Sequence, residues 1–190
     1  MKKDDPRRTL PFVSAYKDFT PPFDIEASLR SALRVVPAKY VVGLDRVVLA
    51  DAAGLPRWRR RAKTYSRKRT VRIPEACGLY HQATRDRRAY IEIFVDNQVT
   101  LGRGFRRLQR ELGALMLAST LFHEIGHHIH FTKHPEQGEP ERIAEKYQMR
   151  FTKRYSWRRV PLIILYAIPL VCMPKFWRAL PRFIRELRRK

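Results

Sequence analysis

The stretch His123-Glu124-Ile125-Gly126-His127 decides the fold of this 190-residue chain. It lies late in an apolar-striped segment that predicts one helix from about residue 105 to residue 132. Residues four apart lie one above the other on a helix, so the two histidines can direct ring nitrogens at one ion. Zinc suits two imidazoles and an oxygen ligand, with the fourth position left to water. Glu124 can take a proton from that water, which predicts hydrolysis. The alternative is a pair of surface histidines beside a helical glutamate.

The third ligand has to come from downstream of this helix. A turn leads to a second helix, for which Pro140 is a favourable first residue. Two antiparallel helices joined by a short turn would bring the glutamates at the start of the second helix back beside His127. Glu141 and Glu145 are the two candidates. Helical rise alone places Glu145 nearer the level of the histidines, so geometry slightly favours it.

The second helix carries a further pattern, E-x-x-A-[DEN]-x-[FY], in residues 141–147. HExxH followed by this pattern resembles the gluzincin zinc metallopeptidases, and the size and layout of the chain resemble their compact variants, the minigluzincins. The resemblance implies that His123, His127 and Glu141 hold zinc, and that Ala144 allows the helices to approach closely. It also implies that Glu145 contacts a ligand histidine. The chain departs from that group in its shorter gap before Glu141 and in having glutamate at 145, where aspartate or asparagine is more usual.

The resemblance, which covers about residues 25–150, implies a protein or peptide substrate and Glu124 as the general base. The developing oxyanion needs a donor besides zinc. Tyr147 is the first candidate, with Tyr155 or a histidine from residues 128–134 as alternatives. We expect the further histidines of that stretch to face solvent or to support the ligands rather than to bind the metal; they are His128, His130 and His134.

The rest of the chain predicts an α+β fold. Asp24 is a plausible N-cap for a helix over residues 24–36, and valine-rich residues 40–50 are typical of a strand in which Gly43 marks a bulge. Residues 78–81 and 89–95 predict a hairpin. We therefore expect a small antiparallel or mixed sheet packed on the HExxH helix and the second ligand-bearing helix. In enzymes of the resembled group the last strand before the metal helix is a sheet edge that binds extended peptide, which implies that role for residues 91–95.

The charge of the chain is extreme. Forty Lys and Arg against eighteen Asp and Glu give a formal net charge of +22, which predicts attraction to polyanions unless the solvated faces are simply basic. Residues 57–72 hold nine Lys and Arg and no acid, with Trp58 and Tyr65 among them. Basic side chains neutralise phosphates and aromatic ones stack on bases, so this segment is the candidate for nucleic-acid binding. The alternative is a flexible charged loop.

We expect three parts along the chain. Residues 1–23 are a basic, proline-bearing segment without regular structure, residues 24–156 the metallopeptidase domain, and residues 157–190 an apolar and basic tail. Residues 160–173 are fourteen in a row without charge, too few to span a bilayer. They predict contact with an anionic membrane surface, or docking against the domain.

Cysteine usage and the N-terminus favour a cytoplasmic location, to which the tail adds membrane association as one of its two alternatives. Cys77 and Cys172 are far apart in sequence and indicate neither a disulfide framework nor a thiolate zinc site. No apolar run of signal-peptide length follows the N-terminus. The rival to a peptidase is a basic protein that binds nucleic acid or a membrane surface and whose metal site is structural or vestigial.

Overall fold

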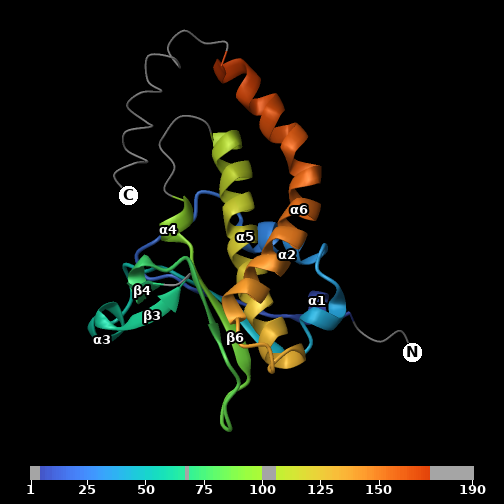
Figure 1. The fold of residues 1–190 in the computed structure, drawn as a ribbon. Coiled ribbons are helices and arrows are strands. Elements are labelled where there is room, and N and C mark those ends of the chain that lie inside the picture. The colour runs from blue at the N-terminus through green and yellow to red at the C-terminus, as the bar shows by residue number, and fades with distance from the viewer. Residues whose placement is uncertain (1–4, 67–68, 100–105, 172–190) are drawn as a thin grey trace.

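Two long antiparallel helices form the frame of the protein (Figure 1). The structure is a computed structural model that describes residues 5–66, 69–99 and 106–171. Helix α5 spans Arg106–Lys133, which confirms the predicted HExxH helix to within a residue. Helix α6 spans Pro140–Val171 and begins at the proline predicted for its first residue. Residue 157, where we expected a separate tail to start, therefore lies in the middle of α6.

A four-stranded mixed sheet lies beside the lower half of α5 (Figure 1). Its order is β1 (Phe12–Ala15), β2 (Leu44–Ala50), β6 (Ala89–Phe94) and β5 (Gly78–His81). β1, β2 and β6 are parallel, and β5 pairs antiparallel with β6 as predicted for the hairpin. The α+β class with a mixed sheet is thus confirmed.

The position of β6 corrects one expectation. We expected residues 91–95 to form the sheet edge beside the metal helix, but β6 lies between β2 and β5. The reason is the parallel pairing with β2, which covers one side of β6 while its hairpin partner covers the other. The edge next to the metal helix is therefore β5.

The core forms where the sheet, α5 and α2 (Ile25–Leu33) meet. Asp24 caps α2 as predicted, since its carboxylate accepts from the Ala27 amide at 2.8 Å. α5 contributes a fully buried face that begins almost two turns before the metal motif and ends just after it, and the sheet contributes alternate residues of β2 and β6. These side chains are Leu117, Leu121, Phe122, Ile125, Ile129, Val47, Leu49, Ile91 and Ile93. The apolar burial fixes α5 rigidly over the sheet.

The strand predicted for residues 40–50 begins later than expected. A 3₁₀ turn, Ala38–Tyr40, follows Pro37, and β2 starts only at Leu44. Gly43 has φ of +92°, so it makes the turn into the strand, and the register of β2 against β6 shifts between Leu44 and Val47. The glycine is needed for this left-handed conformation.

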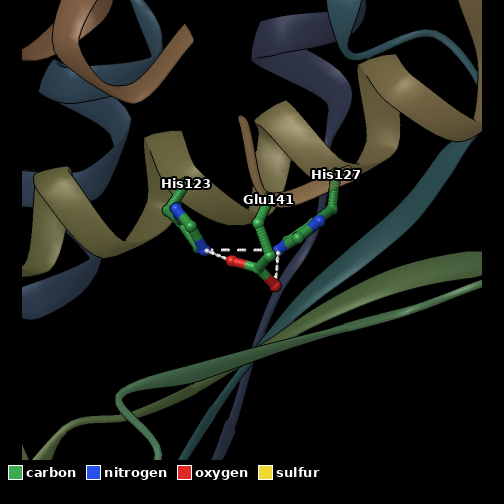
Figure 2. A group of neighbouring side chains, drawn as sticks. All are labelled: His123, His127 and Glu141. Atoms are coloured by element: carbon green, nitrogen blue, oxygen red, sulfur yellow. Dashed lines mark hydrogen bonds and ion pairs between the residues drawn. The ribbon is translucent and has the colours of Figure 1, made fainter. Parts of the chain in front are cut away.

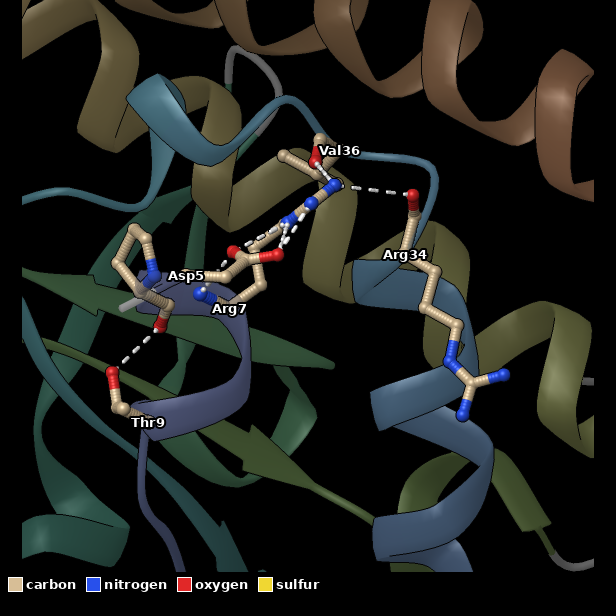
Figure 3. A network of polar contacts seen from close by, with 6 residues as sticks. Asp5, Arg7, Thr9, Arg34 and Val36 are labelled. Carbon is tan, nitrogen blue, oxygen red and sulfur yellow. Dashed lines mark hydrogen bonds and ion pairs between the residues drawn. The ribbon is translucent and has the colours of Figure 1, made fainter. Parts of the chain in front are cut away.

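Part of the N-terminal segment forms regular structure, which corrects the expectation of none in residues 1–23 for the described residues 6–15. Helix α1 spans Pro6–Thr9, and β1 extends the sheet in parallel with β2, Phe12 lying opposite Val47. Figure 3 shows how Arg7 fastens α1 to the end of α2. Its guanidinium binds the Asp5 carboxylate and donates to the main-chain oxygens of Arg34 at 3.4 Å and Val36 at 3.2 Å. These residues take up regular structure because they pair with β2 and with the end of α2, which lie far away in the sequence.

The described residues of the basic segment 57–72 form a helix and two strands. It forms α3 (Arg57–Arg61) and an antiparallel pair, β3 (Lys63–Ser66) and β4 (Arg69–Arg72), followed by a 3₁₀ turn at Ile73–Glu75. Arg59 fastens it to the main sheet through two hydrogen bonds to the buried Glu92 carboxylate, at 2.8 and 2.6 Å. Helix α4 (Asp96–Val99) follows β6. In the described residues no helix is long and apolar enough to cross a membrane.

The Arg59–Glu92 pair predicts a pH dependence of stability. Burial alone would raise the pKa of Glu92, but the hydrogen bonds from Arg59 and His81 outweigh it and lower the pKa from 4.5 to about 2. A pKa lowered by folding contributes stability above pH 4.5, which is lost as the pH falls toward 2. We expect Glu92→Gln to lower the free energy of unfolding by about 2 kcal/mol at neutral pH, with the gap to the unaltered protein closing below pH 4.5.

Urea unfolding at neutral and acidic pH measures this effect. Glu139→Gln is the control, because the Glu139–Arg142 pair is exposed and such pairs contribute little. A gap for Glu92→Gln that stays constant with pH would contradict the assignment.

Candidate metal centre

Three side chains converge between α5 and α6 (Figure 2). His123 and His127 lie one turn apart on α5, and their Nε2 atoms are 3.2 Å apart. Glu141, in the first turn of α6, places one carboxylate oxygen 3.6 Å from the Nε2 of His123 and the other 3.6 Å from the Nε2 of His127. The three groups together can hold one metal ion.

The spacing of these donors fits a tetrahedral metal. Zinc lies about 2.1 Å from nitrogen and oxygen ligands, so two ligands of a tetrahedral ion lie about 3.4 Å from each other. The observed separations of 3.2, 3.6 and 3.6 Å are close to that value. Two imidazoles and one carboxylate also form a donor set typical of zinc sites that keep one position open.

The surroundings of His127 favour the neutral imidazole that a metal requires. Burial lowers the pKa of His127 to about 3, with further lowering by His123 and His130. A neutral imidazole offers a lone pair on one nitrogen, and which nitrogen offers it depends on the hydrogen bond of the other. At physiological pH, His127 is therefore ready to bind a cation without first losing a proton.

Gln148 fixes the orientation of His123. Its side-chain oxygen lies 3.2 Å from His123 Nδ1, and its amide nitrogen donates to Ser119 Oγ at 2.8 Å. Because Ser119 already orients the amide group, its oxygen accepts a hydrogen bond from the protonated Nδ1 of His123. The lone pair on Nε2 then faces the site. We expected Glu145 to contact a ligand histidine in this way, but Glu145 is exposed on α6. Gln148 lies seven residues after Glu141, so both occupy one helical face.

Gly126 lets α6 come close enough to deliver Glu141. A Cβ atom at Gly126 would lie 2.5 Å from the Ala144 Cα and 2.8 Å from the Ala144 carbonyl oxygen. Real Cβ atoms do not approach main-chain atoms so closely, so no side chain fits at this point. The helices are thus in backbone contact beside the metal ligands, and Ala144 is the small residue that faces the glycine.

The site opens into a cavity of about 220 Å³. Its wall combines the metal group, the turn into α6, the edge strand β5 and one residue of β3. The lining residues are Thr64, Gly78, Leu79, Tyr80, His123, Glu124, His127, Phe131, Pro140 and Glu141. Glu124 is buried, and one of its carboxylate oxygens lies 3.0 Å from the point where a Cβ of Gly78 would be. The glycine therefore allows β5 to pass directly over the candidate general base.

The proposed oxyanion donors lie elsewhere. Tyr147 is buried against Tyr40 and Phe151, and burial and Tyr40 raise its pKa. Tyr155 is buried against Phe122. Neither residue is among those that line the cavity. In the described part of the chain the phenol that lines it is that of Tyr80.

Two of the further histidines are buried rather than solvent-facing. His128 Nε2 lies 3.0 Å from the Val42 carbonyl, which can only accept, so Nε2 carries the proton. Nδ1 then accepts from the Tyr80 hydroxyl at 3.1 Å. His128 thereby ties the edge strand β5 to α5. His130 is also buried, whereas His134 lies at the end of α5 beside the exposed Glu136.

Comparison of the chain with models of known protein families, with curated protein sequences and with solved structures finds no match. The residues themselves therefore carry the functional interpretation, and what they show is a candidate His-His-Glu metal site across two packed helices.

Proposed function

We propose that this chain is a zinc-dependent peptidase of gluzincin type. One observation carries the proposal: two histidines and a glutamate stand at the spacing of a tetrahedral ion, next to a buried glutamate on the wall of the same cavity. A site that only stabilises the fold has its metal enclosed by four protein ligands. Here three ligands adjoin a cavity that can admit water and substrate.

Each side chain has a defined task in this proposal. His123, His127 and Glu141 hold the ion, and Gln148 orients His123. Zinc at this position would supply a Lewis acid that makes water acidic enough to lose a proton near pH 7. Glu124 takes that proton as the water attacks the scissile carbonyl, and gives it to the leaving amine. Side chains of β5 and Phe131 line the cavity around these groups.

The substrate in this proposal is an extended peptide lying along β5. Among the described residues β5 ends the sheet, with β6 as its one strand neighbour, and three of its four residues line the cavity. An extended peptide can add to such an edge through main-chain hydrogen bonds. This would place a peptide bond over Glu124, since β5 passes the carboxylate at Gly78.

The zinc content of purified protein tests the site. We expect one zinc per chain in the unaltered protein, a loss of zinc in Glu141→Ala, and full zinc in Glu145→Ala, because Glu141 faces both histidines and Glu145 is exposed. Elemental analysis after dialysis gives the ratio. Glu145→Ala is a matched control, since it removes the same side chain one turn further along the same helix.

Two results would count against the proposal. Loss of zinc only in Glu145→Ala would move the third ligand to that residue. No zinc in the unaltered protein, even after reconstitution, would contradict the peptidase proposal and favour the rival function described next.

The rival function is nucleic-acid binding by the basic segment, with a metal site that is structural or vestigial. Trp58 is exposed on α3, between exposed arginines at 57, 60 and 61. A base can stack on such an indole while the guanidinium groups bind phosphates. The segment also reaches the metal cavity through Thr64, so a bound strand would lie near it.

Salt dependence tests the rival function. If the segment binds single-stranded nucleic acid, Arg60→Ala/Arg61→Ala should reduce the slope of log affinity against log salt by about 1.4, since each lost phosphate contact contributes about 0.7. Arg85→Ala/Arg88→Ala, in the exposed turn before β6, is the control with equal charge. Fluorescence anisotropy with a labelled oligonucleotide gives the slopes, and equal slopes in both variants would contradict binding through this segment.

A further inference from the structure

The far half of α6 exposes apolar side chains that a protein in water normally covers. Trp157 is 82% exposed, Ile164 52% and Leu165 60%, and Val160 is exposed as well. Val160, Ile164 and Leu165 belong to a stretch of α6, residues 160–171, that carries no charge, and Trp157 lies just before it. A helix that is apolar all round needs an apolar environment on more than one side.

The packing of α6 on α5 shows that the last part of this stretch extends beyond α5. Three contacts give the antiparallel register: Gly126 lies against Ala144, Ser119 binds Gln148, and Glu111 pairs with Arg159 at 2.6 Å. Continued at the same register, Ile164 comes level with Arg106, where α5 begins. The last two turns of α6 therefore extend past the end of α5, as Figure 1 shows.

The charge around this stretch selects its partner. Residues 146–190 contain thirteen Lys and Arg and a single acid, Glu186. Two copies of the chain packed through this face would bring two strongly basic segments together, which costs electrostatic energy. An anionic lipid surface offers an apolar interior for the side chains and negative headgroups for the flanking arginines.

We propose that residues 157–171 of α6 dock into the interface of an anionic membrane. The uncharged stretch of twelve residues is about 18 Å long, shorter than the hydrocarbon core of about 30 Å, so it enters one leaflet without crossing. Trp157 lies three residues before this stretch, where an indole suits the boundary between headgroups and acyl chains. The exposed Arg154 precedes it by three residues on the helix.

This docking would hold the metal site away from the bilayer. Glu141 precedes Ile164 by 23 positions on one continuous helix, which is about 35 Å of helical rise. The cavity beside Glu141 therefore stays open to water while α6 is anchored at its other end. The anchor is independent of the chemistry proposed for the site.

Vesicle co-sedimentation of the full chain tests the proposal. We expect binding to vesicles of one part phosphatidylglycerol and two parts phosphatidylcholine, and much weaker binding to phosphatidylcholine alone. Leu165→Asp should weaken binding to the mixed vesicles by about tenfold or more, because it removes an apolar group that the membrane would bury and adds a charge that the anionic headgroups repel. Met149→Asp is the matched control, since Met149 is 68% exposed on the same helix but lies outside the uncharged stretch.

A second pair of variants separates apolar docking from charge. Leu165→Ser should also bind more weakly than Met149→Ser, although neither adds a charge. Equal binding of the Leu165 and Met149 variants would overturn the proposal, because net charge alone would then explain attachment. It would also be overturned if the unaltered protein does not bind mixed vesicles but forms a dimer in sedimentation velocity that Leu165→Asp dissociates.

Discussion

Glu124→Gln is expected to lower the rate of peptide hydrolysis by about a thousandfold, within the range of general acid–base catalysis, while one zinc per chain stays bound. The amide of glutamine has nearly the volume of the carboxylate, so the buried side chain still fits beneath Gly78. It cannot accept a proton from water, which removes the general base. The three metal ligands are untouched, so the metal content should not change.

The measurement combines turnover and elemental analysis. A library of quenched fluorescent peptides supplies the substrates, and zinc is measured in the same samples. Glu145→Gln is the control, because it makes the same chemical change at an exposed position on α6 and should leave turnover unaltered. Hydrolysis by Glu124→Gln at the unaltered rate would contradict the role of Glu124. Absence of hydrolysis by the zinc-loaded unaltered protein would contradict the peptidase function but not the metal site.

The helices were predictable because their signals are local. The apolar stripe and the HExxH spacing predict α5 nearly to the residue, and Pro140 marks the start of α6, but the sequence did not predict that α6 continues to Val171. A short turn between two such helices also brings Glu141 toward the histidines. The angle around the helix also argues against Tyr147 as part of the site. It follows Glu141 by six residues and so lies on another face, whereas Gln148 follows by seven and lies on the same face.

Features that depend on distant partners could not be predicted. The four residues of β1 lie among prolines, and they form a strand only because β2, more than thirty positions later, offers a parallel partner. The order of the strands also depends on pairing between distant segments. The sequence therefore led us to expect β6 at the edge of the sheet, where the structure has β5. The buried state of His128 depends on Val42 and Tyr80, which no spacing around the metal motif could show.

Gly126→Ala is expected to destabilise the protein strongly, although alanine is the better helix former. Replacing glycine by alanine inside a helix normally stabilises it by about 1 kcal/mol. Here the new methyl group would lie 2.5 Å from the Ala144 Cα, and a main-chain atom cannot turn aside as a side chain can. The clash has to separate α5 from α6, so we expect the free energy of unfolding to fall by about 3 kcal/mol.

Chemical denaturation measures that loss, and Gly138→Ala is the control, since no atom lies within 4 Å of a Cβ at that position in the turn between the helices. Separation of the helices also draws Glu141 away from His123 and His127, so zinc affinity should fall in Gly126→Ala and stay unchanged in Gly138→Ala. A Gly126→Ala protein as stable as the control would show that the helices are not in backbone contact. One that is destabilised but binds zinc with unaltered affinity would show that this contact does not position Glu141.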